Sequence, residues 1–339
     1  MRVAKLLLQN FRNFEKKEID FHPKLTMIFG PNASGKSNIC EALLLLSSGR
    51  SFRARNEVEM IRFGSVFSHL ELNNSEEKRG IDLRKRDDNI EKKLLINGVS
   101  KRLSEFAQGF YAILFGPWVI DFLFDSPYQR RYHIDTLLIQ TNNKYYSNLF
   151  AYNKVLTSRN KLLEKVREKR AGVDELSFWD QKLVSHGQFL HDAREDFFDH
   201  LGKTSESFSF KYIKSAISEE LLSKKRQEEI NFGHSLIGPH RDDFKIFHED
   251  RDLLLYGSRG EQRLSVLALA QGEISFIEKE KNVRPLLILD DVFSELDDKS
   301  QKSILFILEK GQTLVTSTHT DMMSFMPQGN KIININGET

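Results

Sequence analysis

The chain of 339 residues has a single cysteine, Cys40, and no apolar run long enough to cross a membrane. One cysteine excludes an intramolecular disulfide framework and a thiolate metal cluster, and the apolar sequence around Cys40 predicts a packed side chain. The longest apolar runs, such as 42–46, are far below the roughly 18 residues that a spanning helix needs. No small-residue cleavage site follows the short apolar stretch at the amino terminus. We therefore expect a first strand there rather than a signal peptide, a cytoplasmic protein and no membrane partner.

A strong excess of charge of either sign is also missing. The sequence has 50 Lys and Arg against 48 Asp and Glu, a net charge of +2. No global field therefore indicates a nucleic-acid partner, and any such contact has to come from local patches. The segment 154–170 is one candidate, and Arg50, Arg53, Arg55 and Arg62 form another. An ordinary solvated surface explains either cluster equally well.

Strand-like segments open and close the chain, whereas its middle has helical spacing. Short apolar or alternating stretches predict strands at 3–9, 17–21, 25–29, 66–72, 80–84, 93–96, 110–115, 284–289 and 313–315. Between about 120 and 227, Gly and Pro become scarce and apolar residues recur at three and four spacing, which predicts helices. We expect an α/β protein with a mixed sheet. One lobe is formed by 1–117 with 236–339, and a compact, mainly helical lobe is inserted at 118–235.

Residues 30–37 fit the phosphate-binding pattern G-x-x-x-x-G-K-[ST], and they stand between strand 25–29 and a predicted helix at 38–47. Such a loop turns its backbone N–H groups and a helix N-terminus toward phosphate oxygens. We expect Lys36 to reach the β and γ phosphates of ATP and the Ser37 hydroxyl to bind Mg²⁺. The predicted nucleotide-binding residues are Gly30, Pro31, Asn32, Ala33, Ser34, Gly35, Lys36, Ser37 and Asn38.

The strand 284–289 ends in two carboxylates, Asp290 and Asp291. This arrangement is typical of the Walker B strand, so Asp290 is expected to hold Mg²⁺ and Asp291 to position or deprotonate the attacking water. A pair of helix caps after a strand is the alternative. Many ATPases of the ABC type have Glu at the second position, and Asp is one methylene shorter, so we expect slow hydrolysis.

The segment Ser258-Arg259-Gly260-Glu261 resembles the signature S-x-G-[QE] of ABC-type ATPases. In that family the serine and glycine contact the γ-phosphate held by a second subunit. The resemblance therefore implies an ATP-dependent homodimer in which Ser258, Gly260 and Glu261 act in trans. Ser258 followed by Glu261 also fits an ordinary capping box at the start of a helix.

Two shorter fragments agree with an ABC-type ATPase. The sequence S-E-L-D at 294–297 resembles the D-loop that follows the Walker B strand. His319 follows strand 313–315, where ABC-type ATPases keep a catalytic switch histidine. A histidine after a strand is also commonly a surface or capping residue.

Longer matches resemble the RecF family. Residues 8–14 resemble its L-x-N-F-R-N-[YF] opening and 126–135 its S-P-x-x-R-R-x-x-x-D segment, while G-P-H-R-D-D at 238–243 and L-D-D-V-F-S-E-L-D at 289–297 match its carboxyl half. The resemblance places Arg12 at the nucleotide. After F-G-P at 115–117 the family usually continues with a P-E-D-L-like sequence, whereas this chain has W-V-I-D, so its nucleotide-sensing loop is expected to differ.

Membership of that family implies a weak, DNA-stimulated ATPase that dimerises on ATP. Its DNA would be single-strand to double-strand junctions and gapped duplex, and its partners RecR and, indirectly, RecO and RecA. The alternatives are a RecF-like ATPase of another DNA-processing or defence system, a transporter ATPase subunit, and a scaffold that uses ATP only to hold its shape. The long insertion and the G-P-H-R-D-D segment disfavour the transporter. About 110 inserted residues are also too few for a long coiled-coil arm.

Overall fold

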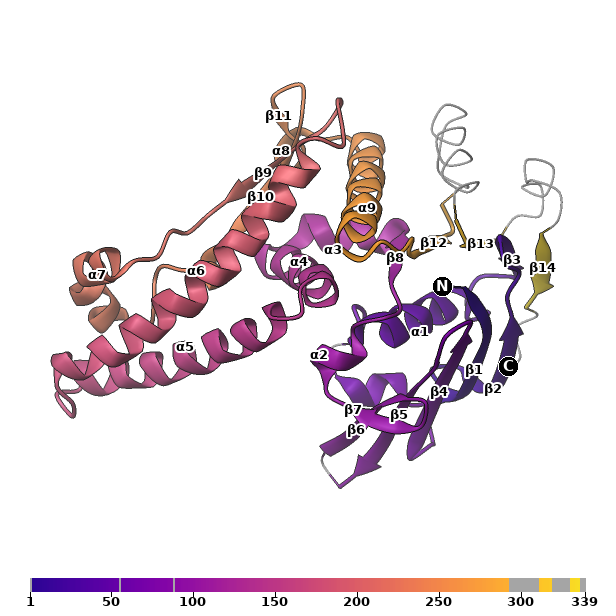
Figure 1. Ribbon diagram of the computed structural model, residues 1–339, viewed down its shortest axis with the longest axis horizontal. Coiled ribbons are helices and arrows are strands. Elements are labelled where there is room, and N and C mark those ends of the chain that lie inside the picture. Colours follow the sequence, from indigo (N-terminus) through magenta and orange to yellow (C-terminus); the bar gives the residue numbers. More distant parts are fainter. Residues whose placement is uncertain (1, 55, 88, 293–310, 319–329, 336–339) are drawn as a thin grey trace. The chain divides into compact units, whose positions relative to one another are not determined.

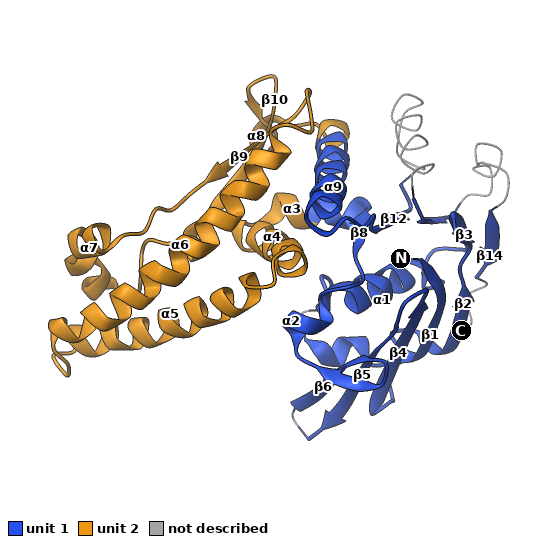
Figure 2. Ribbon diagram, viewed as in Figure 1, with its two compact units in different colours: residues 1–121, 262–339 blue, residues 122–261 orange. Residues whose placement is uncertain are grey.

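The computed structural model describes residues 2–54, 56–87, 89–292, 311–318 and 330–335, and the chain forms two compact units (Figure 1, Figure 2). The first unit comprises 1–121 and 262–339, and the second comprises 122–261. The chain crosses between them within helix α3, Pro117–Asp125, and helix α9, Arg259–Lys281.

The first unit contains an antiparallel sheet whose strand order is β2-β1-β4-β5-β6-β7. Burial alternates along β1, with Leu6 and Leu8 buried and Gln9 exposed, because one face of the sheet packs inward. The Asn97-Gly98 turn joins β6 to β7, and both residues have positive φ, as a tight hairpin requires. The strands are β1 Val3–Phe11, β2 Phe14–Asp20, β4 Phe67–Asn74, β5 Lys78–Arg86, β6 Asn89–Ile96 and β7 Val99–Lys101.

The same unit contains a parallel sheet of order β14-β3-β13-β12-β8. Every residue of β3, β12 and β13 is buried, which explains why β3 and β12 are mostly apolar rather than alternating. Its strands are β14 Lys331–Asn334, β3 Leu25–Phe29, β13 Thr313–Ser317, β12 Leu286–Asp290 and β8 Ala112–Phe115.

Helix α1, Lys36–Ser48, contacts β8 and β12 of the parallel sheet and β4 of the antiparallel sheet. Cys40 is buried on this helix. The helix ends at Gly49, whose φ of 71° is the left-handed conformation that favours glycine. Short helices η1, Glu57–Met60, and α2, Leu103–Phe106, also belong to this unit.

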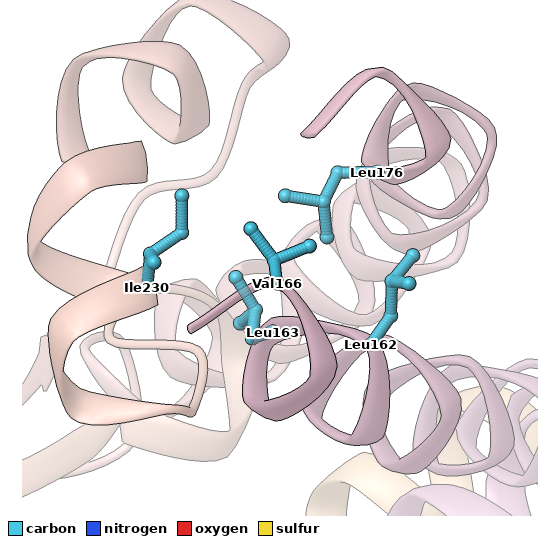
Figure 3. Close-up of a cluster of buried hydrophobic side chains, with 5 residues drawn as sticks. All are labelled: Leu162, Leu163, Val166, Leu176 and Ile230. Carbon is cyan, nitrogen blue, oxygen red and sulfur yellow. The ribbon is translucent and has the colours of Figure 1, made fainter. Parts of the chain in front are cut away.

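The second unit is mainly helical. Helices α5 and α6 pack along each other, and the apolar cluster of Leu162, Leu163, Val166, Leu176 and Ile230 joins them to α7 (Figure 3). The long helices are α4 Pro127–Thr141, α5 Tyr145–Arg167, α6 Leu176–Leu201 and α7 Glu219–Phe232. The short ones are η2 Val173–Glu175, η3 Pro239–Arg241 and α8 Leu253–Tyr256.

A small antiparallel sheet, β11-β10-β9, also belongs to the second unit. Its strands are β9 Ser209–Ile213, β10 Asp243–His248 and β11 Arg251–Asp252. Strand β9 lies inside the stretch predicted to be helical, so that prediction is wrong there. Because β9 packs on α6 and β10 on α4, residues up to 261 join the helical unit, whereas the sequence predicts a boundary at 235.

The predicted α/β fold is confirmed, with parallel and antiparallel strands in separate sheets. The predicted strands of the first unit are present with bounds that differ by a few residues. Within the ranges that the structure describes, none of the helices has the length and apolar character that crossing a membrane requires.

Candidate functional site

The candidate site lies where strands β3, β13 and β12 end. Parallel strands have their carboxyl ends at one edge of the sheet, so the loop after β3 meets the end of β12 although Lys36 and Asp290 are far apart in sequence. Strand β13 lies between them and contributes Thr316. Its hydroxyl donates a hydrogen bond of 2.6 Å to Asp290 Oδ1. Asp290 is 3% exposed, so the fold holds this carboxylate in one place.

The loop 30–37 depends on glycine at two positions. At Gly30 an added Cβ would lie 2.3 Å from the Ile335 carbonyl oxygen. At Gly35 it would lie 2.4 Å from the Phe14 ring, and φ there is 101°. Helix α1 begins directly after Gly35, with no acidic residue in its first turn and no side-chain cap at Gly35. The start of α1 therefore presents N–H groups and partial positive charge to an anion.

Lys36 folds back onto the loop that carries it. Its ammonium donates hydrogen bonds to the carbonyl oxygens of Gly30, at 2.7 Å, and Pro31, at 2.9 Å. Burial lowers the pKa of Lys36, and the nearby charges of Asp291 and Asp290 oppose that shift. Both hydrogen-bond acceptors are neutral carbonyl oxygens, so the ammonium keeps the capacity to bind a phosphate oxygen in their place.

A phosphate group with Mg²⁺ fits these residues. The buried hydroxyl oxygen of Ser34 has no hydrogen-bond partner within the described residues, although it lies inside the loop. A buried polar atom without a partner is costly, and a phosphate oxygen would satisfy it. The Ser37 hydroxyl and the Asp290 carboxylate are the hard oxygen donors that Mg²⁺ prefers. Asp291 follows with φ of 50°, where the chain leaves the sheet.

Arg12 is held by helix α1. Its guanidinium forms two hydrogen bonds with the Glu41 carboxylate, Nε to Oε2 at 2.9 Å and Nη2 to Oε1 at 2.6 Å. Glu41 is fully buried, and it also accepts a hydrogen bond of 2.7 Å from the Ser51 hydroxyl. Sequence reasoning missed Glu41, although a single acid in the apolar run of α1 was a signal for it. Arg12 is therefore joined to the loop 30–37 through the helix that follows that loop.

The turn between β1 and β2 also braces the loop. The Asn13 side chain donates to the Ser34 carbonyl oxygen at 3.4 Å and accepts from Asn38 Nδ2 at 2.8 Å. Arg53 Nη1 donates to Asn38 Oδ1 at 2.9 Å. The segment 8–14 thus supports the loop 30–37 from outside.

In the second unit, Ser258 and Glu261 form the capping box that the sequence allows. The Ser258 N–H and hydroxyl both donate to Glu261 Oε2 at 2.8 Å, and Glu261 N donates to Ser258 Oγ at 3.3 Å. The hydrogen bonds from Ser258 and one from His248 lower the pKa of Glu261 to about 2. Ser258 and Gly260 are exposed, and no described atom lies within 4 Å of where a Gly260 Cβ would stand. The capping box leaves both residues accessible.

Two predicted parts lie outside the described residues: the fragment 294–297 and His319. The segment after β8 is described. There Trp118 stacks on Phe52, with ring centroids 3.5 Å apart and planes 11° from parallel. The W-V-I-D sequence therefore packs its first residue against the chain that leaves α1.

The basic segment 154–170 is not wholly a surface. Arg159 is fully buried, and it donates to Asp180 Oδ1 at 2.7 Å and Glu229 Oε2 at 2.6 Å. The other six basic residues, Lys154, Lys161, Lys165, Arg167, Lys169 and Arg170, are exposed. Of the second basic cluster, Arg55 lies outside the described residues, and Arg53 is tied to Asn38 and Glu41.

The G-P-H-R-D-D segment is a structural junction of the second unit. Arg130 forms two hydrogen bonds with Asp243, at 2.7 and 2.9 Å, and Arg131 donates to the Asp242 carbonyl oxygen at 2.7 Å. Buried Arg194 donates to Asp242 Oδ2 at 2.6 Å. These contacts join α4 and α6 to β10. They account for the S-P-x-x-R-R segment without a ligand.

Comparison with known proteins agrees with this geometry. The family described as RecF/RecN/SMC N terminal domain matches residues 2–339. A DNA replication and repair protein RecF of Agathobacter rectalis is 35% identical over 340 residues, which cover 95% of this chain and 93% of that relative. The RecF of Acetivibrio thermocellus is 34% identical over 351 residues, with 95% and 94% covered.

Solved structures extend the comparison to the fold. A recombination mediator protein RecF of the RecFOR pathway, described as RecF-ATP, matches with a TM-score of 0.85 and 30% identity, covering 94% of this chain and 93% of that one. One described as RecF-ATPrS has the same TM-score at 29% identity, with 98% and 95% covered. An Smc head domain derived from Pyrococcus furiosus shares the fold, with a TM-score of 0.50 and 19% identity. The chain belongs to the RecF family, within the wider RecF/RecN/SMC group.

Proposed function

We propose that the chain is an ATP-dependent DNA-binding repair ATPase that dimerises on ATP. The observation that carries this proposal is the meeting of the loop 30–37 with Asp290 and Thr316 at one edge of the parallel sheet. Similarity to RecF over nearly the whole chain, and to a RecF described with ATP, supports it.

In this proposal residues 30–38 bind the phosphates, and Ser37 and Asp290 hold Mg²⁺, which neutralises phosphate charge when bound. Lys36 exchanges its carbonyl partners for phosphate oxygens. Thr316 fixes the Asp290 carboxylate through its 2.6 Å hydrogen bond. Asp291 orients the attacking water, with His319 as a second catalytic group. Because Asp is shorter than Glu, we expect weak hydrolysis that DNA stimulates.

The lobe formed by 1–117 and 236–339 acts as the ATPase, and Ser258, Gly260 and Glu261 of a second copy complete its site. The exposure of Ser258 and Gly260 supports this role, since the capping box leaves them accessible. Arg12 joins the nucleotide site from its place on Glu41.

The proposed substrate is DNA at single-strand gaps and junctions. In the cytoplasm the protein would work with RecR and RecO in recombinational repair and would help load RecA. The RecF relatives support this role, since they are DNA replication and repair proteins. The exposed lysines and arginines between 154 and 170 are the basic surface that best suits a DNA backbone.

Sedimentation with and without Mg²⁺-ATP tests the proposal. The parent is expected to shift from monomer to dimer on ATP. Lys36→Arg and Ser258→Arg should each stay monomeric, because one loses phosphate contacts and the other fills the face offered to the partner. Mixing the two variants should restore dimers that hold one intact composite site. Dimerisation of both single variants like the parent would overturn the sandwich arrangement.

A further inference from the structure

The first unit has a polar cavity at the amino ends of the parallel strands. The residues that line it directly precede β3, β8, β12 and β13, at 23–24, 110–111, 282–285 and 311–312, and Arg2 and Val3 join them. Parallel strands place these starts at one edge, opposite the edge of the loop 30–37. Five residues of strand separate the two edges by about 17 Å. The cavity is therefore distinct from the nucleotide site.

The cavity is basic. Arg2, Lys24 and Arg284 line it, and the described lining contains no acidic residue. Arg284 has an outside partner, since its Nη1 donates to Glu278 Oε1 at 2.6 Å. The carboxyl end of α9 adds about half a negative charge nearby. The three cations carry three positive charges, of which Glu278 and the helix end offset about one and a half. The cavity therefore has a net charge of roughly +1.5.

The fold fixes the backbone of Lys24 and Arg2 and the side-chain stem of Arg284. The Lys24 carbonyl oxygen accepts from Thr313 N at 2.7 Å, and the Arg2 carbonyl oxygen accepts from Ser75 N at 3.0 Å. The Arg284 stem crosses Gly311 so closely that an added Cβ would lie 2.7 Å from its Cδ. The backbone around the cavity is therefore preorganised, and the charged ends of Arg2 and Lys24 can turn to a ligand.

The Gln312 side chain fixes the backbone segments beside the cavity. Its side-chain oxygen accepts from Val3 N at 2.7 Å, and its Nε2 donates to the carbonyl oxygens of Val3, at 2.7 Å, and His22, at 3.0 Å. This side chain ties β1 and the start of β3 to the start of β13. With its hydrogen bonds used internally, Gln312 sets the shape of the cavity and leaves recognition to the cations.

We propose that this cavity binds a phosphomonoester of nucleotide size. Such a group carries 1.5 to 2 negative charges near pH 7, which matches the residual charge of the cavity, whereas a carboxylate carries one. The cavity volume of about 360 Å³ lies in the range of small-molecule sites and exceeds the need of a bare phosphate ion. Pro23, Tyr111 and Val283 add apolar wall for a sugar or base. The phosphate could belong to a free 5′-nucleotide or to the phosphorylated 5′ end of a DNA strand.

The test compares the full-length parent with the double variant Arg2→Ala/Lys24→Ala. The matched control is Lys16→Ala, which removes an exposed lysine of the same unit that does not line the cavity. One arm measures the anisotropy of a labelled single strand carrying a 5′-phosphate or a 5′-hydroxyl. The other arm measures AMP binding by calorimetry, with the loop 30–37 saturated by a non-hydrolysable ATP analogue.

We expect the parent and Lys16→Ala to prefer the 5′-phosphorylated strand roughly tenfold. Loss of that preference in the double variant, but not in Lys16→Ala, would support the site and identify a strand end as its ligand. Loss of AMP binding in the double variant alone would support the site and identify a free nucleotide. If the double variant matches the parent and Lys16→Ala in both arms, the site is refuted. The strand arm rests on the proposed DNA function and the AMP arm does not. ATP-dependent sedimentation of the same variant shows separately whether the nucleotide site still works.

Discussion

Arg159 in the second unit and Lys36 in the first are both buried cations, but their partners differ. The guanidinium of Arg159 meets Asp180, Glu229 and the Ser235 hydroxyl at 2.6–2.7 Å, two of them full negative charges. Within the described residues, the hydrogen-bond partners of the Lys36 ammonium are two backbone carbonyl oxygens. A cation matched by carboxylates is saturated and stabilises the fold, whereas one held by neutral acceptors can still bind an anion.

Two further buried groups show a similar contrast. In the second unit, buried Arg194 is shared among Asp135, Asp242, the Tyr145 hydroxyl and the Pro239 carbonyl oxygen. In the first unit, the Ser34 hydroxyl has no partner within the described residues. Burial of charge alone therefore does not identify a functional site. A buried polar or charged group whose partners do not match it identifies a candidate functional site.

The largest expected effect is on the stability of the second unit. Arg159→Met leaves Glu229 buried without its cation, which should cost about 3–5 kcal/mol of unfolding free energy. Hydrogen exchange of the α5 and α7 amides measures that loss. Lys161→Met, two positions away and exposed, is the matched control and should change stability by less than about 0.5 kcal/mol. Equal amide protection in the two variants would show that the ion pairs of Arg159 do not stabilise the second unit.

In the first unit, substitution of a buried charged residue should lower ATP hydrolysis rather than stability. Asp290→Asn keeps the acceptor for the Thr316 hydroxyl but removes a charge from the proposed metal site, so ATP hydrolysis should fall about 100-fold or more. Thermal unfolding should change by less than about 1 kcal/mol. A phosphate-release assay and calorimetry measure the two effects, with exposed Asp20→Asn as control. A stability loss as large as that of Arg159→Met would remove the distinction between the units.

A third prediction concerns pH. Burial lowers the pKa of His240 to about 4, and the hydrogen bond from Nε2 to the Ser235 carbonyl oxygen at 3.2 Å opposes that shift without cancelling it. The Tyr152 hydroxyl donates to Nδ1 at 2.7 Å, which requires the neutral ring. The folded pKa is below the unfolded value of about 6.5, so this stabilisation is complete above pH 6.5 and is lost as pH falls toward 4.

Stability of the second unit should therefore fall by about 1–2 kcal/mol between pH 7.5 and 4.5 through His240, the figure being reduced for its partial exposure. Asp242, Arg131 and Arg241 act on the same ring. The unfolding free energy, measured with urea across that pH range, should change less with pH for His240→Gln than for the parent. His234→Gln tests whether removing any histidine has this effect, and an unchanged slope in His240→Gln would contradict the prediction.

The smallest expected effects are on the unfolding free energy and concern the glycines that end two helices. Gly49 ends α1 with φ of 71° and Gly233 ends α7 with φ of 74°, so alanine at either position should cost about 1 kcal/mol in backbone strain. An alanine Cβ would lie 2.4 Å from Leu103 Cδ1 at Gly49, but 2.9 Å from the exposed, flexible Arg167 Nη1 at Gly233. Gly49→Ala should cost about 2 kcal/mol in urea unfolding. Equal costs would show that the packing around Leu103 yields as easily as Arg167.

Much of the first unit could be predicted from local sequence. Continuous apolar runs predicted β3 and β12, because strands covered on both faces have no solvent side to mark with polar residues. The phosphate loop was predicted from its glycine and lysine spacing. Strand β9 was missed because its residues pair with β10, about 30 positions away, and the pairing outweighs the local helical pattern.

By itself the sequence determined the phosphate-binding pattern at 30–37, the position of the carboxylates that end β12 and the RecF resemblance, since spacing and residue type alone define these patterns. Only the tertiary structure decided which charges are matched. It buried Arg159 between Asp180 and Glu229, tied Arg12 to Glu41, and brought Arg2, Lys24 and Arg284 to one cavity. The physical reason is that electrostatic energy depends on distance and burial, and both are set by contacts between residues remote in the chain.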